Sequence, residues 1–117
     1  MLYIIKTTTP TKKEAQFLSQ LLIAKKLVAC VQIQKIESAY FWKGKMEEKK
    51  EFLLTLKSTK EHIKTIQKLL MQNHSYDLCE FIVLKPSYTN KEYEEWVVKS
   101  CKDWVQKALK FAKLWLC

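Results

Sequence analysis

The chain contains a single glycine, Gly44, in the segment Trp42-Lys43-Gly44-Lys45. Glycine enters left-handed backbone conformations without steric cost, so a chain with one glycine is expected to use it where the backbone reverses most tightly. We therefore predict a long β-hairpin over residues 29–57 with its tip at 43–45. Phosphate-binding loops and dinucleotide-binding fingerprints need two or three glycines at fixed offsets, so the composition excludes both.

Length and composition indicate one domain over residues 1–117. A chain of 117 residues can bury roughly two thirds of its unfolded surface around one core. No apolar run approaches the ~20 residues that span a bilayer, and the first residues do not resemble a secretory signal. We therefore expect a cytoplasmic protein without a membrane span.

The net charge is +9, and all 21 basic residues are lysines. Arginine makes the bidentate contacts that read guanine and clamp phosphate, whereas lysine carries a mobile, well-hydrated point charge. A solvated lysine-rich surface is therefore favoured over a nucleic-acid partner, with only loose attraction to polyanions left open. The four cysteines are too widely spaced for the paired ligation of structural zinc, and we expect Cys30 and Cys79 to be buried.

Apolar periodicity predicts the order of the elements. Residues 2–8 and 81–84 are short, apolar and followed by prolines, as buried strands are. Capping-box patterns at Thr11-x-x-Glu14 and Ser58-x-x-Glu61 predict helices that run to about residue 26 and to about residue 73. A third helix is expected from about residue 90 to beyond residue 111. The apolar phase changes within residues 28–42, which predicts a β-bulge near residues 34–35.

The order β-α-β-β-α-β with an added helix indicates an α+β, ferredoxin-like fold with a four-stranded antiparallel sheet. The hairpin arms are longer than the other two strands, so they leave backbone groups unpaired. The third helix is apolar over a wide arc, more than a monomer of this size is expected to bury. Both features predict a homo-oligomer.

The side chains that could bind a metal or take part in catalysis lie in the segment His74-Ser75-Tyr76-Asp77-Leu78-Cys79-Glu80. It holds an imidazole, a phenol, two carboxylates and a thiol, which serve metal ligation and acid–base chemistry. Taken alone, the segment favours a structural reading, because histidine commonly caps the end of a helix and Tyr76 could close the rim of the core.

Several spaced motifs together resemble the CutA family of divalent-cation tolerance proteins over residues 1 to about 97. The resemblance rests on the segments 27–31, 40–47 and 51–57, on His74-x-Tyr76-Asp77-x-x-Glu80, and on Tyr93-x-x-Trp96. It implies a ferredoxin-like protomer and a homotrimer in which long hairpins extend the sheets of neighbouring subunits. The architecture is also similar to that of PII signalling proteins, which bind small ligands between subunits.

The resemblance also implies a cleft between subunits and a role in the response to metal ions. Copper binding in some members uses a cysteine and a histidine pair, whereas this chain has Thr7, Asn73 and His74 at those positions. His74 is therefore the one metal ligand carried over, and copper or another divalent metal is the implied cofactor. The residues implied for the cleft are Trp42, Glu51, Lys57, His74, Tyr76, Asp77 and Glu80.

Three classes of function can be compared. The favoured one is a trimeric protein of the metal response that binds a metal or small ligand and catalyses no reaction. Its alternative is a PII-like signalling or scaffold trimer that binds a small anion or a partner protein. An acylphosphatase-like enzyme would need an arginine, and a Cys79–His74 hydrolase has no assurance that its groups meet. An RNA-binding module would need exposed aromatics on the central strands, where this chain offers only Tyr3 and Phe52.

Residues 98–117, with Trp104, Phe111 and Trp115, extend beyond the resemblance. We interpret them as a helical extension packed on the trimer, with a docking surface for another protein as the alternative.

Overall fold

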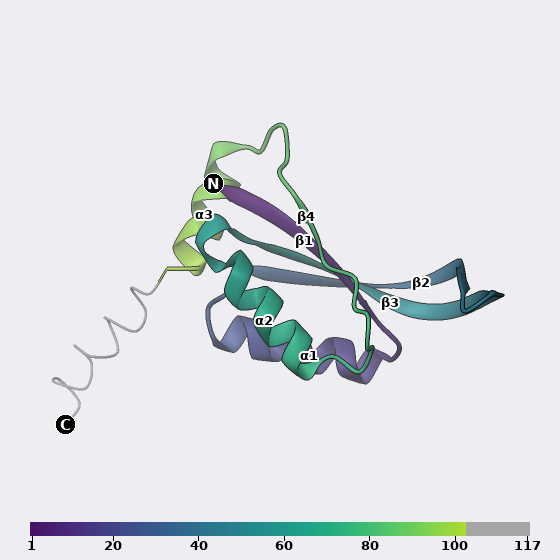
Figure 1. Ribbon diagram of the computed structural model, residues 1–117. Coiled ribbons are helices and arrows are strands. Elements are labelled where there is room, and N and C mark those ends of the chain that lie inside the picture. Colours follow the sequence, from purple (N-terminus) through teal and green to yellow (C-terminus); the bar gives the residue numbers. More distant parts are fainter. Residues whose placement is uncertain (103–117) are drawn as a thin grey trace, which may run out of the picture.

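The computed structural model describes residues 1–102 of the chain. The strands form one antiparallel sheet in the order β2-β3-β1-β4, and the chain is a ferredoxin-like βαββαβ domain followed by a further helix (Figure 1). The elements are β1 (Leu2–Thr9), α1 (Lys12–Ala24), β2 (Cys30–Trp42), β3 (Lys45–Thr59), a 3₁₀ turn (Lys60–His62), α2 (Ile63–Asn73), β4 (Ile82–Leu84) and α3 (Lys91–Ser100).

Helices α1 and α2 cover one face of the sheet, which we call the helix face (Figure 1). Strand side chains alternate between faces, so Ile5, Leu54 and Leu56 point together into this layer. Helical spacing of three or four residues turns Leu18 and Leu22 of α1 towards them, and all five side chains are fully buried. The opposite side of the sheet is called the open face below.

The two predicted helix starts have different outcomes. Thr11 caps α1 as predicted, because its hydroxyl accepts a hydrogen bond of 3.1 Å from the Glu14 N–H. The second capping box is wrong, since β3 continues to Thr59 and α2 begins only after the 3₁₀ turn. The buried hydroxyl of Ser58 instead donates to the carbonyl of Leu27, so it joins the end of β3 to the segment before β2.

The β2–β3 hairpin is regular from end to end. Its register runs without interruption from Cys30 opposite Lys57 to Trp42 opposite Lys45, so the predicted bulge is wrong. The apolar phase changes because the surroundings change along the strand. Near its start β2 faces the helices, and beyond residue 35 it extends past them. Apolar side chains beyond residue 35 are mostly exposed on both faces of the strand, so no core requires them to lie on one face.

The hairpin turn is made by Lys43 and Gly44, at φ of 51° and 79°. Positive φ at both central residues defines a type I′ turn, whose twist matches that of the flanking strands. The prediction drawn from the lone glycine is therefore confirmed, with a lysine sharing the left-handed conformation.

The hairpin is longer than the sheet that carries it. Pairing between β1 and β3 ends with Thr9 opposite Phe52, so residues 45–51 of β3 pair only with β2. Residues 36–51 are called the hairpin overhang, which projects to the right in Figure 1.

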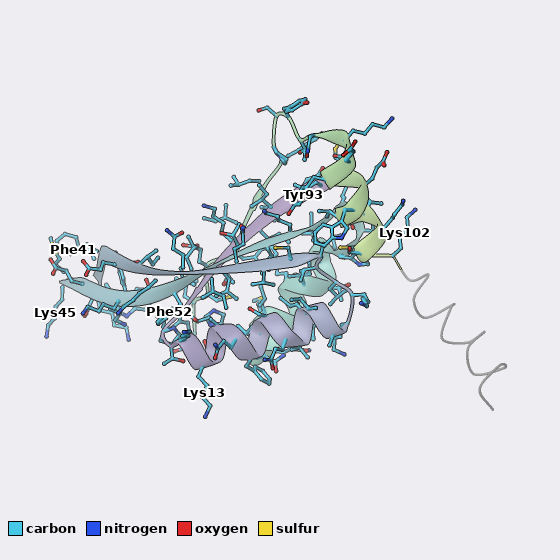
Figure 2. All side chains as sticks on the ribbon, turned by 180° about the vertical axis from the view of Figure 1, so that it is seen from behind. Lys13, Phe41, Lys45, Phe52, Tyr93 and Lys102 are labelled. Carbon is cyan, nitrogen blue, oxygen red and sulfur yellow. The ribbon has the colours of Figure 1, made fainter. Side chains whose placement is uncertain are left out.

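Helix α3 packs near the other end of the sheet, where its Val97 forms a small core with Leu2 and Cys101. Figure 2 shows Tyr93 near this end and Phe41 at the hairpin tip. In residues 1–102 no helix is long and apolar enough to cross a membrane. The predicted continuation of the third helix, with Trp104, Phe111 and Trp115, lies outside the described residues.

Candidate functional site

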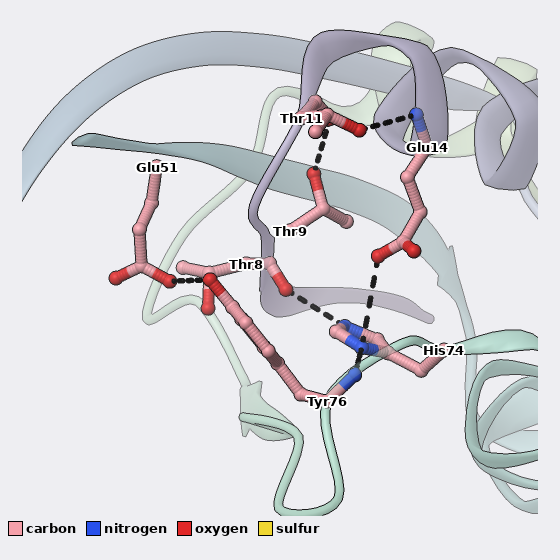
Figure 3. A network of polar contacts seen from close by, with 7 residues as sticks. All are labelled: Thr8, Thr9, Thr11, Glu14, Glu51, His74 and Tyr76. Carbon is pink, nitrogen blue, oxygen red and sulfur yellow. Dashed lines mark hydrogen bonds and ion pairs between the residues drawn. The ribbon is translucent and has the colours of Figure 1, made fainter. Parts of the chain in front are cut away.

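His74 lies where α2 ends and the chain turns towards β4. Its backbone is extended, at φ −85° and ψ 140°, so the helix ends at this residue. Nε2 lies 2.7 Å from the carbonyl oxygen of Thr8, and Nδ1 accepts a hydrogen bond of 3.2 Å from the Tyr76 N–H (Figure 3). A carbonyl oxygen can only accept, so this pattern assigns the proton of the neutral ring to Nε2.

His74 thereby connects three segments of the chain. Its side chain is 1% exposed, and Nδ1 lies 3.8 Å from Oε2 of Glu14 in the first turn of α1. That carboxylate oxygen is buried and has no hydrogen-bond partner among the described residues. The end of β1, the start of α1 and the loop after α2 therefore meet at one imidazole (Figure 3).

These contacts do not fit the predicted role of His74 as a metal ligand. A ring nitrogen that binds a metal must offer its lone pair, and here one nitrogen donates while the other already accepts. At the other two implied positions, the Thr7 side chain is fully buried and the Asn73 amide donates to the carbonyl of Leu69. Within residues 1–102, no three histidine, cysteine, aspartate or glutamate side chains are grouped so that they could hold one metal ion.

Tyr76 crosses from this buried network to the open face. Its hydroxyl donates a hydrogen bond of 2.8 Å to Oε2 of Glu51, which is 6% exposed (Figure 3). Burial, and then the hydrogen bond and negative charge of Glu51, raise the pKa of Tyr76 well above its ordinary value of 10.0. The phenol therefore stays neutral and serves as a fixed donor. The ammonium of Lys49 lies 5.9 Å from the centre of the Tyr76 ring.

A cavity of about 540 Å³ opens beside this pair. It forms where the overhang runs past the end of β1, because the loop after α2 lies there in place of a strand. Its walls combine aromatic rings, carboxylates and hydroxyls, with one ammonium. The lining residues are Thr8, Ser38, Tyr40, Trp42, Lys49, Glu51, Ser75, Tyr76, Asp77, Leu78 and Glu80.

The structure divides the predicted cleft residues into three groups. The larger group lines the cavity and comprises Trp42, Glu51, Tyr76, Asp77 and Glu80. His74 lies behind the wall and positions Tyr76 instead of facing the cavity.

Lys57 belongs to a different place on the open face. Its ammonium lies 5.1 Å from the ring centre of Tyr93 on α3. It stands six residues from Glu51 along β3, which corresponds to roughly 20 Å. Within one protomer Lys57 therefore cannot contact a ligand held beside Glu51.

The lining residues that sequence reasoning missed are Thr8, Ser38, Tyr40, Lys49, Ser75 and Leu78. Tyr40 and Lys49 each lie two residues from a predicted cleft residue on the same strand. Period-two alternation places them on the same face, so this signal could have found both.

The fold and the cavity define a ferredoxin-like protein with a long hairpin and a potential binding site at its base. The family of the CutA1 divalent ion tolerance protein matches residues 3–100. The chain belongs to this family, as the spaced motifs predicted.

Relatives and solved structures agree with this assignment. The chain is 34% identical over 101 residues to "Protein CutA 1, chloroplastic" of Oryza sativa subsp. japonica, a match that covers 86% of the chain and 57% of the rice protein. The structure of CutA from Synechococcus elongatus has a TM-score of 0.83 at 35% identity, covering 86% of this chain and 90% of that one. The periplasmic divalent cation tolerance protein CutA from Archaeoglobus fulgidus has a TM-score of 0.84 at 29% identity, covering 87% and 100%. This chain thus spans less than two thirds of the length of the rice relative.

Proposed function

We propose that this chain works as a homotrimer in the cellular response to divalent metal ions, and that it binds a small ligand in the open-face cavity without catalysing a reaction. The observation that carries the proposal is the cavity itself. Its buried Glu51–Tyr76 pair lies beside the hairpin overhang, where β2 has no pairing partner on its outer edge in one protomer. A metal-bound His74 is not part of the proposal, since its ring nitrogens hold the loop in place.

The unpaired edge of the overhang supports assembly. Strand β2 lies at the edge of the sheet and offers 13 residues of backbone along its outer side. Long open edges favour pairing with another chain, and proteins normally cover or interrupt them. Strand β4, at the opposite edge, has only three residues, so β2 is the edge better suited to a second copy.

Apolar side chains at the hairpin tip support the same conclusion. Phe41 is 71% exposed and Met46, directly opposite it in the register, is 63% exposed. An aromatic side chain offers about 200 Å², so covering Phe41 would remove roughly 140 Å² of apolar surface. At ~25 cal/mol per Å² this is up to about 3.5 kcal/mol for each protomer, enough to contribute visibly to assembly.

Light scattering after size-exclusion chromatography tests the assembly. The wild-type chain should run as a trimer, and Phe41→Ser should dissociate at higher protein concentration than wild type. Phe17→Ser is the matched control, because Phe17 is 54% exposed and belongs to α1 rather than to the overhang. A folded wild-type monomer at micromolar concentration would contradict the trimer.

The metal-response role needs a separate experiment in cells. A host that lacks its own family member should regain growth in Cu²⁺ or Zn²⁺ when it expresses this chain, and Trp42→Leu should reduce the rescue. The same growth assay is done with His74→Ala, and the stability of this variant is measured. A loss of rescue that accompanies a loss of stability is then assigned to folding and not to the metal response. Equal growth with and without the chain would remove the metal role and leave the PII-like alternative, a signalling or scaffold trimer that binds a small anion or partner protein.

The predicted cytoplasmic location stays a prediction, because the relatives compared include a protein named chloroplastic and one named periplasmic.

A further inference from the structure

The cavity has a charge that is opposite to that of the whole chain. Its lining holds the carboxylates of Glu51, Asp77 and Glu80 and the single ammonium of Lys49, a formal charge of −2, while the chain carries +9. Charges more than about 8 Å apart are largely screened at physiological salt, so a bound ligand senses the lining more than the distant lysines. The lining therefore favours a cation.

Three aromatic rings supply the rest of the wall. Tyr40, Trp42 and Tyr76 bring π faces that attract ammonium groups and also contact aliphatic chains. The protein already shows this interaction, because the Lys49 ammonium lies 5.9 Å from the centre of the Tyr76 ring, whose hydroxyl donates to the buried carboxylate of Glu51. Lys49 is an alkylammonium of the chain itself that lies in the position an amine ligand would take.

The spread of the carboxylates separates an extended cation from a metal ion. The acidic side chains share one cavity, yet within residues 1–102 they do not gather into a group of three that could hold a single ion. A metal ion needs several ligand atoms within about 2.6 Å, whereas a ligand with two ammonium groups joined by an aliphatic chain can reach carboxylates that stand apart. A volume of about 540 Å³ accommodates such a molecule.

We propose that the cavity binds an aliphatic diamine or polyamine, with its ammonium groups at the carboxylates and its methylene chain against Trp42 and Tyr40. This inference rests on the proposed ligand-binding function of the same cavity and adds the chemical class of the ligand. Glu51, fixed by the Tyr76 hydroxyl, provides the inner anchor, and Asp77 and Glu80 provide the outer ones. Lys49 then acts as an internal competitor that an amine displaces.

Calorimetric titration of the full-length protein at fixed ionic strength tests the proposal. The probes are 1,4-diaminobutane and spermidine, compared with butylamine and the neutral 1,4-butanediol. The diamine and triamine should bind, butylamine should bind at least about five-fold more weakly, and the diol should show no heat of binding. Equal affinity for diamine and diol would overturn the amine assignment.

Variants identify the site of binding. Asp77→Asn and Glu80→Gln should each weaken diamine binding about five-fold, and Lys49→Met should strengthen it. Glu48→Gln is the matched control, since Glu48 lies next to Lys49 on the other face of the strand and does not line the cavity. Loss of affinity in the control equal to that in Asp77→Asn would assign binding to general surface charge and refute the site.

A second set of probes distinguishes failure of the amine class from failure of the cavity. Inorganic phosphate, citrate and Zn²⁺ are titrated into wild type and into Trp42→Leu. If one of them binds in a Trp42-dependent way while the amines do not, the cavity is a ligand site and the amine proposal is wrong. If Trp42→Leu changes the affinity of neither the amines nor these probes, both the proposed ligand site and the amine class are refuted.

Discussion

Replacing Gly44 with valine should destabilise the proposed trimer by an amount that the turn geometry sets. A Cβ atom at Gly44 would meet no heavy atom within 4 Å, so steric contact with neighbouring residues adds nothing. The cost comes from the backbone, since φ of 79° is a left-handed conformation that costs an L-residue about 1–2 kcal/mol. A β-branched residue falls at the upper end of this range.

Gly44→Asn is the matched comparison. Asparagine enters the left-handed region several times more often than other non-glycine residues, so most of the strain is removed while the Cβ remains. Loss of glycine also restricts the unfolded chain in both variants, by about 0.4–1 kcal/mol, and this contribution cancels between them. The free energy of unfolding of Gly44→Val should therefore be about 1 kcal/mol lower than that of Gly44→Asn for each hairpin. For a trimer that unfolds cooperatively the difference should be about three times as large.

Urea denaturation followed by far-UV circular dichroism, at several protein concentrations, measures these differences. Helical signal before the transition should be the same in wild type and both variants, because the turn is far from α1 and α2 (Figure 1). Coincident transitions for valine and asparagine would refute the argument that backbone conformation sets the cost. A difference of only about 1 kcal/mol per trimer would mean that the three hairpins do not unfold together.

Three further outcomes are expected. The unfolded chain loses the Tyr76 proton above about pH 10 while the folded chain keeps it, so stability should fall with rising pH. Tyr76→Phe should reduce that slope in urea titrations, whereas a slope unchanged from that of exposed Tyr88→Phe would contradict the raised pKa. Burial raises the pKa of the Cys101 thiol, so iodoacetamide should label half-buried Cys30 before Cys101, which should react only after denaturation, as mass spectrometry can show. His74→Ala should lose about 2 kcal/mol or more of stability but bind Cu²⁺ as wild type does, and a large drop in Cu²⁺ affinity would restore the metal role.

The elements that could be predicted from the sequence are those whose signals are local. The lone Gly44 located the hairpin tip because only the backbone of the turn decides where a positive φ is needed. Thr11 located the start of α1 for a similar reason, since a cap is made within four residues. The bulge was predicted wrongly because the pattern of apolar residues in β2 reflects which neighbours surround the strand, and those neighbours come from distant parts of the chain.

The role of His74 shows the same limit at the site. Its position at the end of α2 was readable, but its partners are Thr8, 66 residues away, and the backbone of Tyr76. A histidine whose neighbours in sequence are polar has the pattern of a ligand, and only the tertiary contacts show that both nitrogens hold the loop. The cavity residues that were named in advance came from the family resemblance, whereas Tyr40 and Lys49, which strand alternation places on the same face, were missed.

The separation of Lys57 from Glu51 connects the site with the assembly. Both side chains face the open side of β3, but six residues of strand hold them roughly 20 Å apart, so one protomer cannot offer both to a small ligand. If the two residues share a cleft, as the family resemblance implies, Lys57 must come from a different copy of the chain from the one that supplies Glu51. The proposed trimer and the proposed cleft therefore depend on each other. A Lys57→Gln variant that raises diamine affinity in the trimer, because it removes a competing positive charge, and has no effect in a dissociated Phe41→Ser monomer, would support both together. The same change of affinity in trimer and monomer would mean that Lys57 acts at a distance within its own chain, and would refute a cleft shared between copies.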